Sequence, residues 1–369
     1  MSQNTLKRTP LYEEHVARKA RMVPFAGYEM PVQYEGVKQE HLAVRNAAGL
    51  FDVSHMGELE LEGDEAGAVI DSLITNDVSK LTDGRALYTC ACNERGTIID
   101  DLIVYRLRAD KWLVVCNASN RETIVPHFMA AAQGRCSLED ASDRTALIAL
   151  QGPKALAVAA LAGADGGSLH ELPSFALRDA ELAGVECLVA RTGYTGEDGV
   201  EIFCDAADAV ALWRGLLEAG RELGIAPAGL AARDTLRLEA RLSLYGNDID
   251  DTTNPLEAGL AWTVKLGKAA FLGKDALLAI KAAGFNRKLV GFEMVGRGIA
   301  RHGYPLLDAS GTPIGVCTSG SPAPSLDKSI GLGYVTVGHD AIGTTIHVDC
   351  RGKAIEAVVV ATPFYKRPI

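Results

Sequence analysis

Apolar residues form two runs on either side of a polar turn between Arg85 and Tyr105, where the chain reads RALYTCACNERGTIIDDLIVY. Two runs rich in Leu, Ile, Val, Tyr and Thr flank a turn cluster, Asn-Glu-Arg-Gly, at positions 93–96. This pattern predicts a β-hairpin with strands over about 85–92 and 97–106.

Two adjacent acids, Asp100 and Asp101, interrupt the second apolar run. Successive side chains of a strand point to opposite faces, so the two carboxylates cannot act as a close acid/base pair. An acid on a largely apolar face is costly unless a polar partner or a ligand meets it. The sequence leaves two interpretations open: one acid meets a ligand, or one bonds backbone donors near the turn while the other is solvated. Asp101 shares its face with Ile99, Ile103 and Tyr105, and Asp100 shares the other with Ile98, Leu102 and Val104.

The rest of the first 150 residues alternates between helical and strand patterns. Predicted helices cover about 11–19, 36–47, 64–74 and 120–132, and predicted strands about 53–61, 112–117 and 146–150. A loop rich in Gly, Pro and aromatic residues is expected between Phe25 and Tyr34. Helices packed on one face of an antiparallel sheet would make an α+β domain with a split βαβ, ferredoxin-like core.

Two later segments have other patterns. Residues 151 to about 280 favour helices near 154–161, 206–223 and 230–240, and strands near 186–191 and 200–204. The loop TGYTGEDG at 192–199 is Gly-rich, but it lacks the lysine of a nucleotide-binding phosphate loop. From Leu289 to Ile369, short strands alternate with Gly/Pro turns, which is typical of a small β-barrel or sandwich.

The length of 369 residues exceeds that of one growing hydrophobic core, so two or three domains are expected. No apolar run approaches the roughly 18 residues of a membrane span, and the N-terminal residues resemble neither a signal nor a transit peptide. We therefore expect a cytoplasmic protein that does not enter a membrane. The net charge of −10 argues against nucleic-acid binding, and an anionic substrate would need a local basic pocket.

The eight cysteines lie mainly in apolar runs and show neither a CxxC motif nor a Cys/His cluster with zinc spacing. Cys90 and Cys92 share one strand face and are interpreted as small core residues. We expect no metal and no nucleotide cofactor. His55 is interpreted as a hydrogen-bonded structural residue rather than a catalyst.

Five separated motifs, in this order, make the chain resemble the T-protein family of the glycine cleavage system, which are tetrahydrofolate-dependent aminomethyltransferases. They are FAGYEMP at 25–31, FDVSHMG at 51–57, IIDDLIVY at 98–105, RTGYTGEDGVE at 191–201 and ARDTLRLE at 232–239. The resemblance runs from Thr9 to Arg367. Three departures remove no ionisable functional group: Tyr28 stands where Trp is usual, Thr97 where Gly is usual and Ala323 where Ser is usual.

The resemblance implies an α+β, three-domain aminomethyltransferase-like fold around a central folate pocket. It has a ferredoxin-like antiparallel sheet domain and a C-terminal β-barrel or jelly-roll-like domain. The expected boundaries are 1–52 plus 145–285 for a discontinuous folate-binding domain, 53–144 for the domain with the acidic hairpin, and 286–369 for the barrel.

The resemblance also implies a reaction, in which the methylene of an aminomethyl group on the lipoyl arm of the partner H-protein passes to tetrahydrofolate. The products are methylene-tetrahydrofolate, ammonia and the reduced arm. By the family pattern Asp101 is the catalytic carboxylate, which stabilises an iminium-like species and helps to move the proton. Glu201 matches the residue that accepts pterin N–H bonds, and Arg233 the residue that binds the folate carboxylates. The pocket walls are assigned to Met56, Tyr88, Tyr105, Asn117, Tyr194 and Tyr245, each of which fits an ordinary core position equally well.

Two other functions are compatible with the same architecture. One is a non-catalytic folate-binding protein of iron–sulfur maintenance, and the other is a folate-dependent demethylase of small methylated amines or sulfonium compounds. The first kind carries Lys-Gly-Cys-Tyr where this chain has Thr-Gly-Tyr-Thr at 192–195. The acidic pair disfavours the second, though less decisively.

Overall fold

The structure, a computed structural model, describes residues 6–163 and 166–368. The chain divides into two compact units, each of which is described by itself. Unit 1 comprises residues 1–70, 78–88 and 102–234, and unit 2 comprises residues 71–77, 89–101 and 235–369. Residues 1–5, 164–165 and 369 of the expected domains lie outside the described residues, and the three-domain boundaries stay a prediction.

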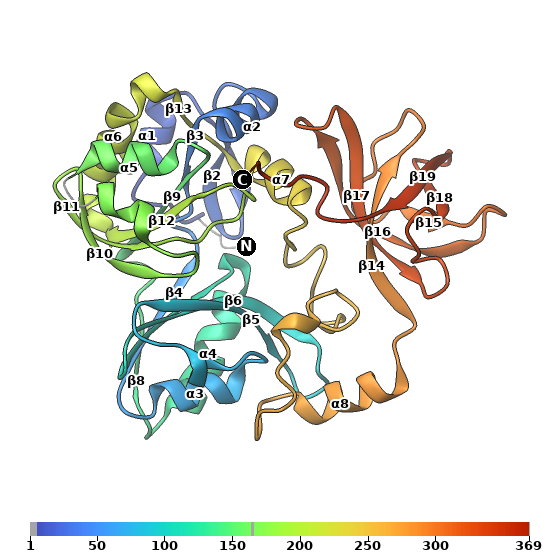
Figure 1. Cartoon of the computed structure of the whole chain (residues 1–369), viewed down its shortest axis with the longest axis horizontal. Coiled ribbons are helices and arrows are strands. Elements are labelled where there is room, and N and C mark those ends of the chain that lie inside the picture. Colours follow the sequence, from blue (N-terminus) through green and yellow to red (C-terminus); the bar gives the residue numbers. More distant parts are fainter. Residues whose placement is uncertain (1–5, 164–165, 369) are drawn as a thin grey trace, which may run out of the picture. The chain divides into compact units, whose positions relative to one another are not determined.

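Unit 1 contains a six-stranded sheet with the order β10–β11–β12–β9–β3–β13, in which β13 pairs parallel with β3 and the other pairs are antiparallel. Figure 1 shows helices α5 and α6 packed against this sheet, and their apolar side chains share its core. Every β12 residue before Asp205 is buried, so Glu201 in that strand is enclosed. The bounds are Ala48–Asp52 (β3), Thr145–Gln151 (β9), Leu177–Leu182 (β10), Val185–Ala190 (β11), Gly199–Asp205 (β12), Ile225–Pro227 (β13), Tyr12–Ala17 (α1), Val37–Asn46 (α2), Ala155–Ala162 (α5), Ala209–Ala219 (α6) and Leu230–Glu239 (α7).

The loop expected between Phe25 and Tyr34 is wrong for most of its length. Strands β1 (Arg21–Phe25) and β2 (Tyr28–Gln33) form an antiparallel ribbon instead. Gly27 has a φ of +83°, which permits the two-residue turn between them. Prolines in both runs disfavour a strand in a sheet interior, but a two-stranded ribbon tolerates their missing N–H groups.

The second sheet has the order β5–β6–β7–β4–β8 and contains the hairpin predicted from the two apolar runs that flank the turn at 93–96. The division between the units passes through β5 and β6. The strand expected over 53–61 begins later, because Ser54 N donates to Asp52 Oδ1 at 2.9 Å and Met56 N donates to Val53 O at 3.1 Å, which makes residues 53–56 a turn. The bounds are Gly57–Glu62 (β4), Arg85–Cys92 (β5), Ile98–Arg108 (β6), Lys111–Cys116 (β7), Ser137–Asp140 (β8), Ala66–Leu73 (α3) and Arg121–Ala132 (α4).

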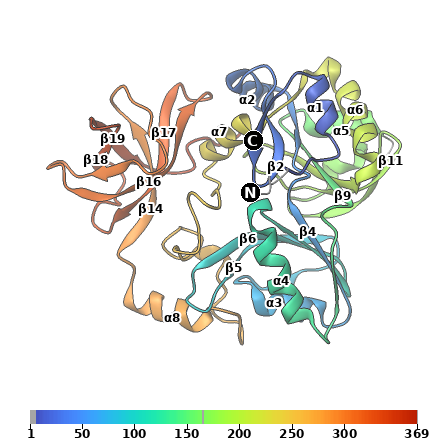
Figure 2. The ribbon, with the colours of Figure 1, turned by 180° about the vertical axis from the view of Figure 1, so that it is seen from behind.

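Unit 2 contains a closed six-stranded barrel with the order β14–β17–β16–β15–β18–β19, which confirms the predicted C-terminal β-barrel. Figure 2 shows its strands from behind. Phe292, Leu306, Val335 and Ile346 are fully buried in its core. The bounds are Lys274–Ala283 (α8), Arg287–Met294 (β14), Pro305–Leu307 (β15), Pro313–Ala323 (β16), Lys328–Thr336 (β17), Thr345–Asp349 (β18) and Ala354–Val360 (β19).

Across residues 6–163 and 166–368, no helix has both the length and the apolar character needed to span a membrane.

Candidate active site

The turn of the acidic hairpin is fixed by Asn93. Its backbone N–H donates to Thr97 O at 2.9 Å, and its Oδ1 accepts from Arg95 N at 2.9 Å. Gly96 has a φ of +75°, which a residue with a Cβ adopts only with strain. A fixed turn sets the register of the strand that follows, so the turn residues determine which face of the sheet each of the two acids points to.

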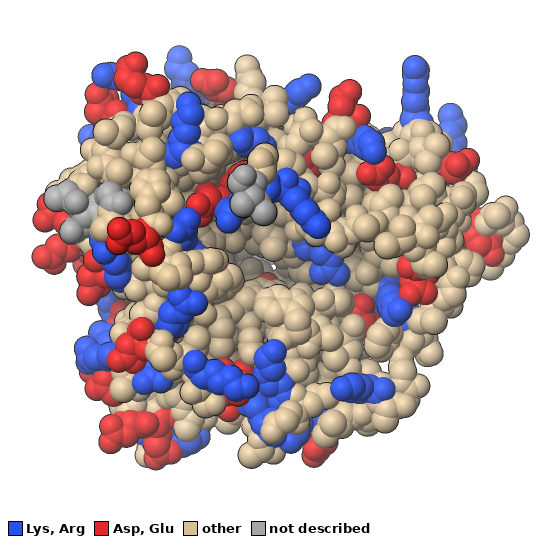
Figure 3. All heavy atoms as spheres, viewed as in Figure 1, with Lys and Arg blue, Asp and Glu red and all other residues tan. Residues whose placement is uncertain are grey.

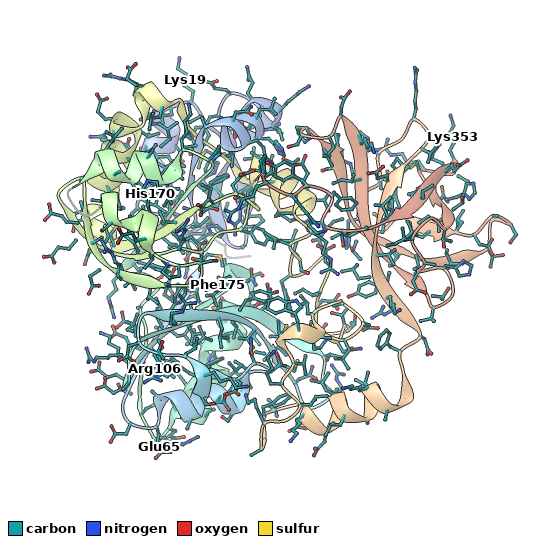
Figure 4. The ribbon with its side chains drawn as sticks, in the orientation of Figure 1. Lys19, Glu65, Arg106, His170, Phe175 and Lys353 are labelled. Atoms are coloured by element: carbon teal, nitrogen blue, oxygen red, sulfur yellow. The ribbon has the colours of Figure 1, made fainter. Side chains whose placement is uncertain are left out.

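Asp100 and Asp101 point to opposite faces of β6. Asp100 is fully buried, and its face includes Arg106, labelled in Figure 4, whose guanidinium lies 5.4 Å from the centroid of the Trp112 ring. A Cβ added at Gly67 of α3 would lie 2.9 Å from that ring, so helix α3 covers this face of the sheet. Asp101 is half-buried on the other face. Only the second acid therefore has access to a ligand on the side away from α3.

Unit 2 brings Tyr245 to the acidic hairpin. The hydroxyl of Tyr245 donates to Ile98 O at 3.4 Å. Burial raises the pKa of Tyr245, and nearby carboxylates raise it further, among them Asp100 and Asp101. The phenol is therefore neutral and acts as a hydrogen-bonding group beside the acids.

A buried ion pair holds the loop that carries Tyr245. Arg237 Nη1 donates to Asp248 Oδ2 at 2.5 Å, and the two side chains are 1% and 0% exposed. Asp248 also accepts from Leu244 N at 3.0 Å, and from Thr318 Oγ1 at 2.5 Å and Ser319 Oγ at 2.8 Å on barrel strand β16. One carboxylate thus connects helix α7, the Tyr245 loop and the barrel.

Unit 1 brings together a second group around Glu201. Glu201 Oε2 accepts a short hydrogen bond from Thr192 Oγ1, which lies 3.4 Å from the hydroxyl of Tyr105. The edge of the Tyr105 ring meets Phe203, with the ring centroids 5.6 Å apart. Burial raises the pKa of Glu201 above its ordinary value, while the Thr192 bond and the charge of Arg233 oppose that rise. A bound donor pair would favour the ionised form of Glu201.

Arg233 and Tyr194 join this group, because the guanidinium carbon of Arg233 lies 4.4 Å from the centroid of the Tyr194 ring. Tyr194 lies in the Gly-rich loop, which is braced by Arg45. Arg45 Nη1 donates to Thr195 O and to Glu197 Oε1, each at 2.8 Å. The Arg45 and Glu197 side chains are 4% and 3% exposed.

The remaining wall residues are half-buried, as pocket-lining side chains would be. The β4–β7 ladder starts at the pair Gly57–Cys116, so Met56 and Asn117 flank the same end of it. Tyr88 lies in β5, on the unit 1 side of the division within that strand.

The environment of His55 differs from the one expected from the sequence. It is 2% exposed, and its Nδ1 has no hydrogen-bond partner among the described residues, so it is not the satisfied structural histidine that we expected. The rings of Phe25 and Tyr28 meet it edge-on at centroid distances of 5.5 and 6.4 Å. Burial and the charge of Arg233 lower the pKa of His55 to about 4, so the ring is neutral near pH 7.

The sequence analysis did not identify two further residues of the Glu201 group, Thr192 and Gln151. Gln151 Nε2 donates to Thr192 O at 3.1 Å, and Thr195 Oγ1 donates to Gln151 Oε1 at 2.9 Å. A Cβ at Gly193 would lie 2.0 Å from Gln151 Oε1, so a larger residue there would displace the Gln151 amide from these bonds. The loop motif could have drawn attention to Thr192, whereas nothing in the local sequence signals Gln151.

The cysteines are free thiols, and Cys90 and Cys92 are buried, as expected for small core residues. Within the described part of the chain, no three His, Cys, Asp or Glu side chains are grouped so that they could hold a metal ion.

Comparisons with known proteins extend over almost the whole chain. The family described as "GCVT N-terminal domain" matches residues 11–268, and the "Glycine cleavage T-protein C-terminal barrel domain" matches residues 287–366. The aminomethyltransferase of Symbiobacterium thermophilum is 52% identical over 99% of this chain and 98% of its own. That of Halothermothrix orenii is 49% identical over 97% of this chain and 100% of its own. The crystal structure of the glycine cleavage system aminomethyltransferase T from Bartonella henselae superimposes with a TM-score of 0.92 at 39% identity, covering 98% and 99% of the two chains.

Proposed function

The chain belongs to the glycine cleavage T-protein family and is an aminomethyltransferase, and from this premise we propose that it transfers the methylene of an aminomethyl group on the lipoyl arm of H-protein to tetrahydrofolate. The products are methylene-tetrahydrofolate, ammonia and the reduced arm. The observation that carries the proposal is the separation of the acidic pair, with Asp100 fully buried and Asp101 half-buried on the opposite face of β6.

In this proposal Asp101 is the catalytic carboxylate. The methylene carbon begins with one bond to the amine nitrogen and one to a sulfur of the arm, and both bonds break as two nitrogens of tetrahydrofolate bond to it. Departure of ammonia leaves positive charge on this carbon, and a fixed carboxylate beside it stabilises the charge as it develops. Cleavage of the carbon–sulfur bond frees the arm, and the two protons lost by the folate nitrogens go to the ammonia and to that sulfur. Asp101 also receives and releases a proton as the amine leaves. Tyr245 donates to Ile98 O, three residues before Asp101, and so helps to hold the backbone that positions this carboxylate.

Tetrahydrofolate supplies the nitrogens that accept the methylene, and residues of unit 1 suit its two ends. The pterin edge presents adjacent N–H donors, and a buried carboxylate such as Glu201 accepts two of them. Thr192 fixes one oxygen of Glu201, which leaves the carboxylate in a single orientation. The carboxylates of the folate tail suit the planar donor fork of Arg233, whose position over Tyr194 is set by a cation–π contact.

Met56, Tyr88, Tyr105, Asn117, Tyr194 and Tyr245 are proposed as the residues that enclose the folate. Apolar and aromatic walls exclude water, which would otherwise hydrolyse the activated methylene. The same exclusion strengthens the interaction between Asp101 and the developing charge.

The test is ammonia release from aminomethylated H-protein, measured with and without tetrahydrofolate. We expect release to depend on both substrates, with methylene-tetrahydrofolate formed in equal amount. A chain that demethylates small methylated amines and leaves aminomethylated H-protein unchanged would support the demethylase alternative instead.

A further inference from the structure

Trp262 differs from the other tryptophans of the chain in its exposure. Trp112 and Trp213 are 3% and 0% exposed, whereas Trp262 is 57% exposed. Scattered exposed aliphatic residues are ordinary, but an exposed indole leaves a large apolar area in water. Tryptophan is also among the residue types enriched in the side chains that dominate protein–protein binding.

The segment that presents Trp262 is held firmly within unit 2. Trp262 is the middle residue of the short 3-10 helix η6 (Ala261–Thr263), which Thr263 Oγ1 closes by donating to Leu260 O at 2.8 Å. Directly after it, Lys265 N donates to Thr75 O at 2.8 Å. The indole therefore projects from a fixed backbone, and little conformational entropy would be lost there on binding.

Trp262 also lies close to the acidic hairpin. The hydroxyl of its neighbour Thr263 is 3.9 Å from the Cys90 sulfur in β5. The turn bond from Asn93 N to Thr97 O sets the two strands of the hairpin side by side, so Cys90 lies across the hairpin from the acidic pair. A protein that delivers an arm to Asp101 would thus pass near Trp262.

The charge around Trp262 is opposite in sign to that of the chain. Residues 261–281 contain four lysines and one aspartate, but Lys268 is buried and paired with Asp71 Oδ1 at 3.1 Å. Three lysines against Asp275 leave a local charge of +2, whereas the whole chain carries −10. Lys265 and Lys281 are exposed, and Lys265 Nζ donates to Trp262 O at 2.7 Å. Figure 3 shows basic side chains over α8, the helix within this segment. Such a local basic surface attracts an acidic partner that the rest of the chain would repel.

We propose that Trp262 and Lys265 form a docking surface for the carrier protein that brings the lipoyl arm, and that the carrier presents an acidic surface with an apolar centre to it. The inference rests on the proposed function, because that function requires a protein-bound arm to reach Asp101. Trp262 supplies the apolar anchor, and Lys265 supplies long-range attraction and orientation.

The experiment compares Trp262→Ala with wild type in the reverse direction, with methylene-tetrahydrofolate and ammonium and with one of two acceptors. The acceptors are the reduced lipoylated carrier protein and free dihydrolipoamide. We expect the KM for the carrier to rise about ten- to thirtyfold, with kcat and the rate with free dihydrolipoamide within about twofold of wild type. Ile342→Ser, which alters a 71% exposed side chain of the barrel unit, is the matched control and should leave both acceptors unaffected.

Charge is tested separately with Lys265→Glu. Wild-type kcat/KM for the carrier should fall as salt is added, whereas the variant should start lower at low salt and depend less on salt. An unchanged carrier KM in Trp262→Ala, or an equal loss with both acceptors, would overturn the docking surface. A wild-type enzyme inactive with both acceptors would overturn the proposed function, and the docking surface with it.

Discussion

Each unit holds a tyrosine-bearing loop with one buried arginine–carboxylate pair, but the two pairs are built differently. In unit 1, Arg45 binds Glu197 and Thr195 O, both of which lie in the Tyr194 loop. In unit 2, Asp248 accepts from Arg237, from its own loop and from two hydroxyls of barrel strand β16. The first pair braces one loop, whereas the second connects three parts of its unit.

The carboxylates beside these loops differ as well. Glu201 is 8% exposed within a sheet, so burial raises its pKa, and it suits recognition of a neutral donor pair. Asp101 is half-buried at the start of β6, where a cationic substrate can reach it. The comparison separates binding, which we assign to unit 1, from chemistry, which we assign to the hairpin, and each prediction below tests that separation.

The largest expected effect is on stability. Asp248→Asn removes the charge that faces buried Arg237, and leaving a buried charge uncompensated costs about 3–5 kcal/mol of the free energy of unfolding. Glu197→Gln should cost less, about 1.5–3 kcal/mol, because its partner keeps a bond to Thr195 O. Denaturant unfolding measures the loss of unfolding free energy in each variant. In Asp248→Asn, hydrogen exchange should be faster in the Tyr245 loop and the barrel. Equal costs would contradict the distinction between the pairs.

The next effect is on turnover. Asp101→Asn keeps the size and hydrogen-bonding shape of the side chain but removes its charge, so aminomethyl transfer should fall about a hundred- to a thousandfold, or about 2.7–4 kcal/mol. Folate affinity should change much less, because the interaction strengthens mainly as positive charge develops.

Asp100→Asn is the matched control for that variant. It should retain turnover but lower the melting temperature, because Asp100 is fully buried. If Asp100→Asn proves to be the inactive variant and both proteins fold, the assignment of the sheet faces is inverted.

A smaller effect is expected on folate affinity. Arg233→Ala removes a charge-assisted contact of roughly 1.5–3 kcal/mol, which weakens tetrahydrofolate binding about ten- to a hundredfold in calorimetry. Arg233→Lys should retain only part of the wild-type affinity for tetrahydrofolate, since an ammonium lacks the bidentate geometry of a guanidinium. Tyr194→Phe keeps the aromatic face and serves as the control. Unchanged affinity in Arg233→Ala would remove Arg233 from the site.

The smallest effect concerns pH. If Glu201 accepts two N–H bonds as a carboxylate, folate affinity should decline as pH falls through its raised pKa, by up to tenfold per pH unit. Thr192→Val removes a hydrogen bond that lowers this pKa, so the decline should begin at higher pH than in wild type. Glu201→Gln should bind more weakly at neutral pH and lack this dependence. Superimposable pH profiles of Thr192→Val and wild type would argue against ionised Glu201 as the acceptor.

The amino-acid sequence determined the features that depend on neighbouring residues. Two apolar runs around the turn at 93–96 predicted the hairpin, and the alternation of side chains along a strand predicted the opposite facing of its acids. Gly/Pro turns from Leu289 onward predicted the barrel. These predictions succeed because the period of a strand and the residue preferences of a turn depend on only a few neighbouring residues. The same reasoning wrongly predicted a loop for residues 25–34. The prolines there argued against a strand, but a two-stranded ribbon tolerates them.

Only the tertiary structure decided which distant side chains meet. Arg45 and Glu197 are 152 residues apart, and Gln151 lies 41 residues from the carbonyl of Thr192 that it binds. No local pattern encodes such partners, because the packing of whole strands and helices sets their distance. The burial that lowers the pKa of His55 and raises that of Glu201 has the same origin, since desolvation is produced by the surrounding fold and not by sequence neighbours.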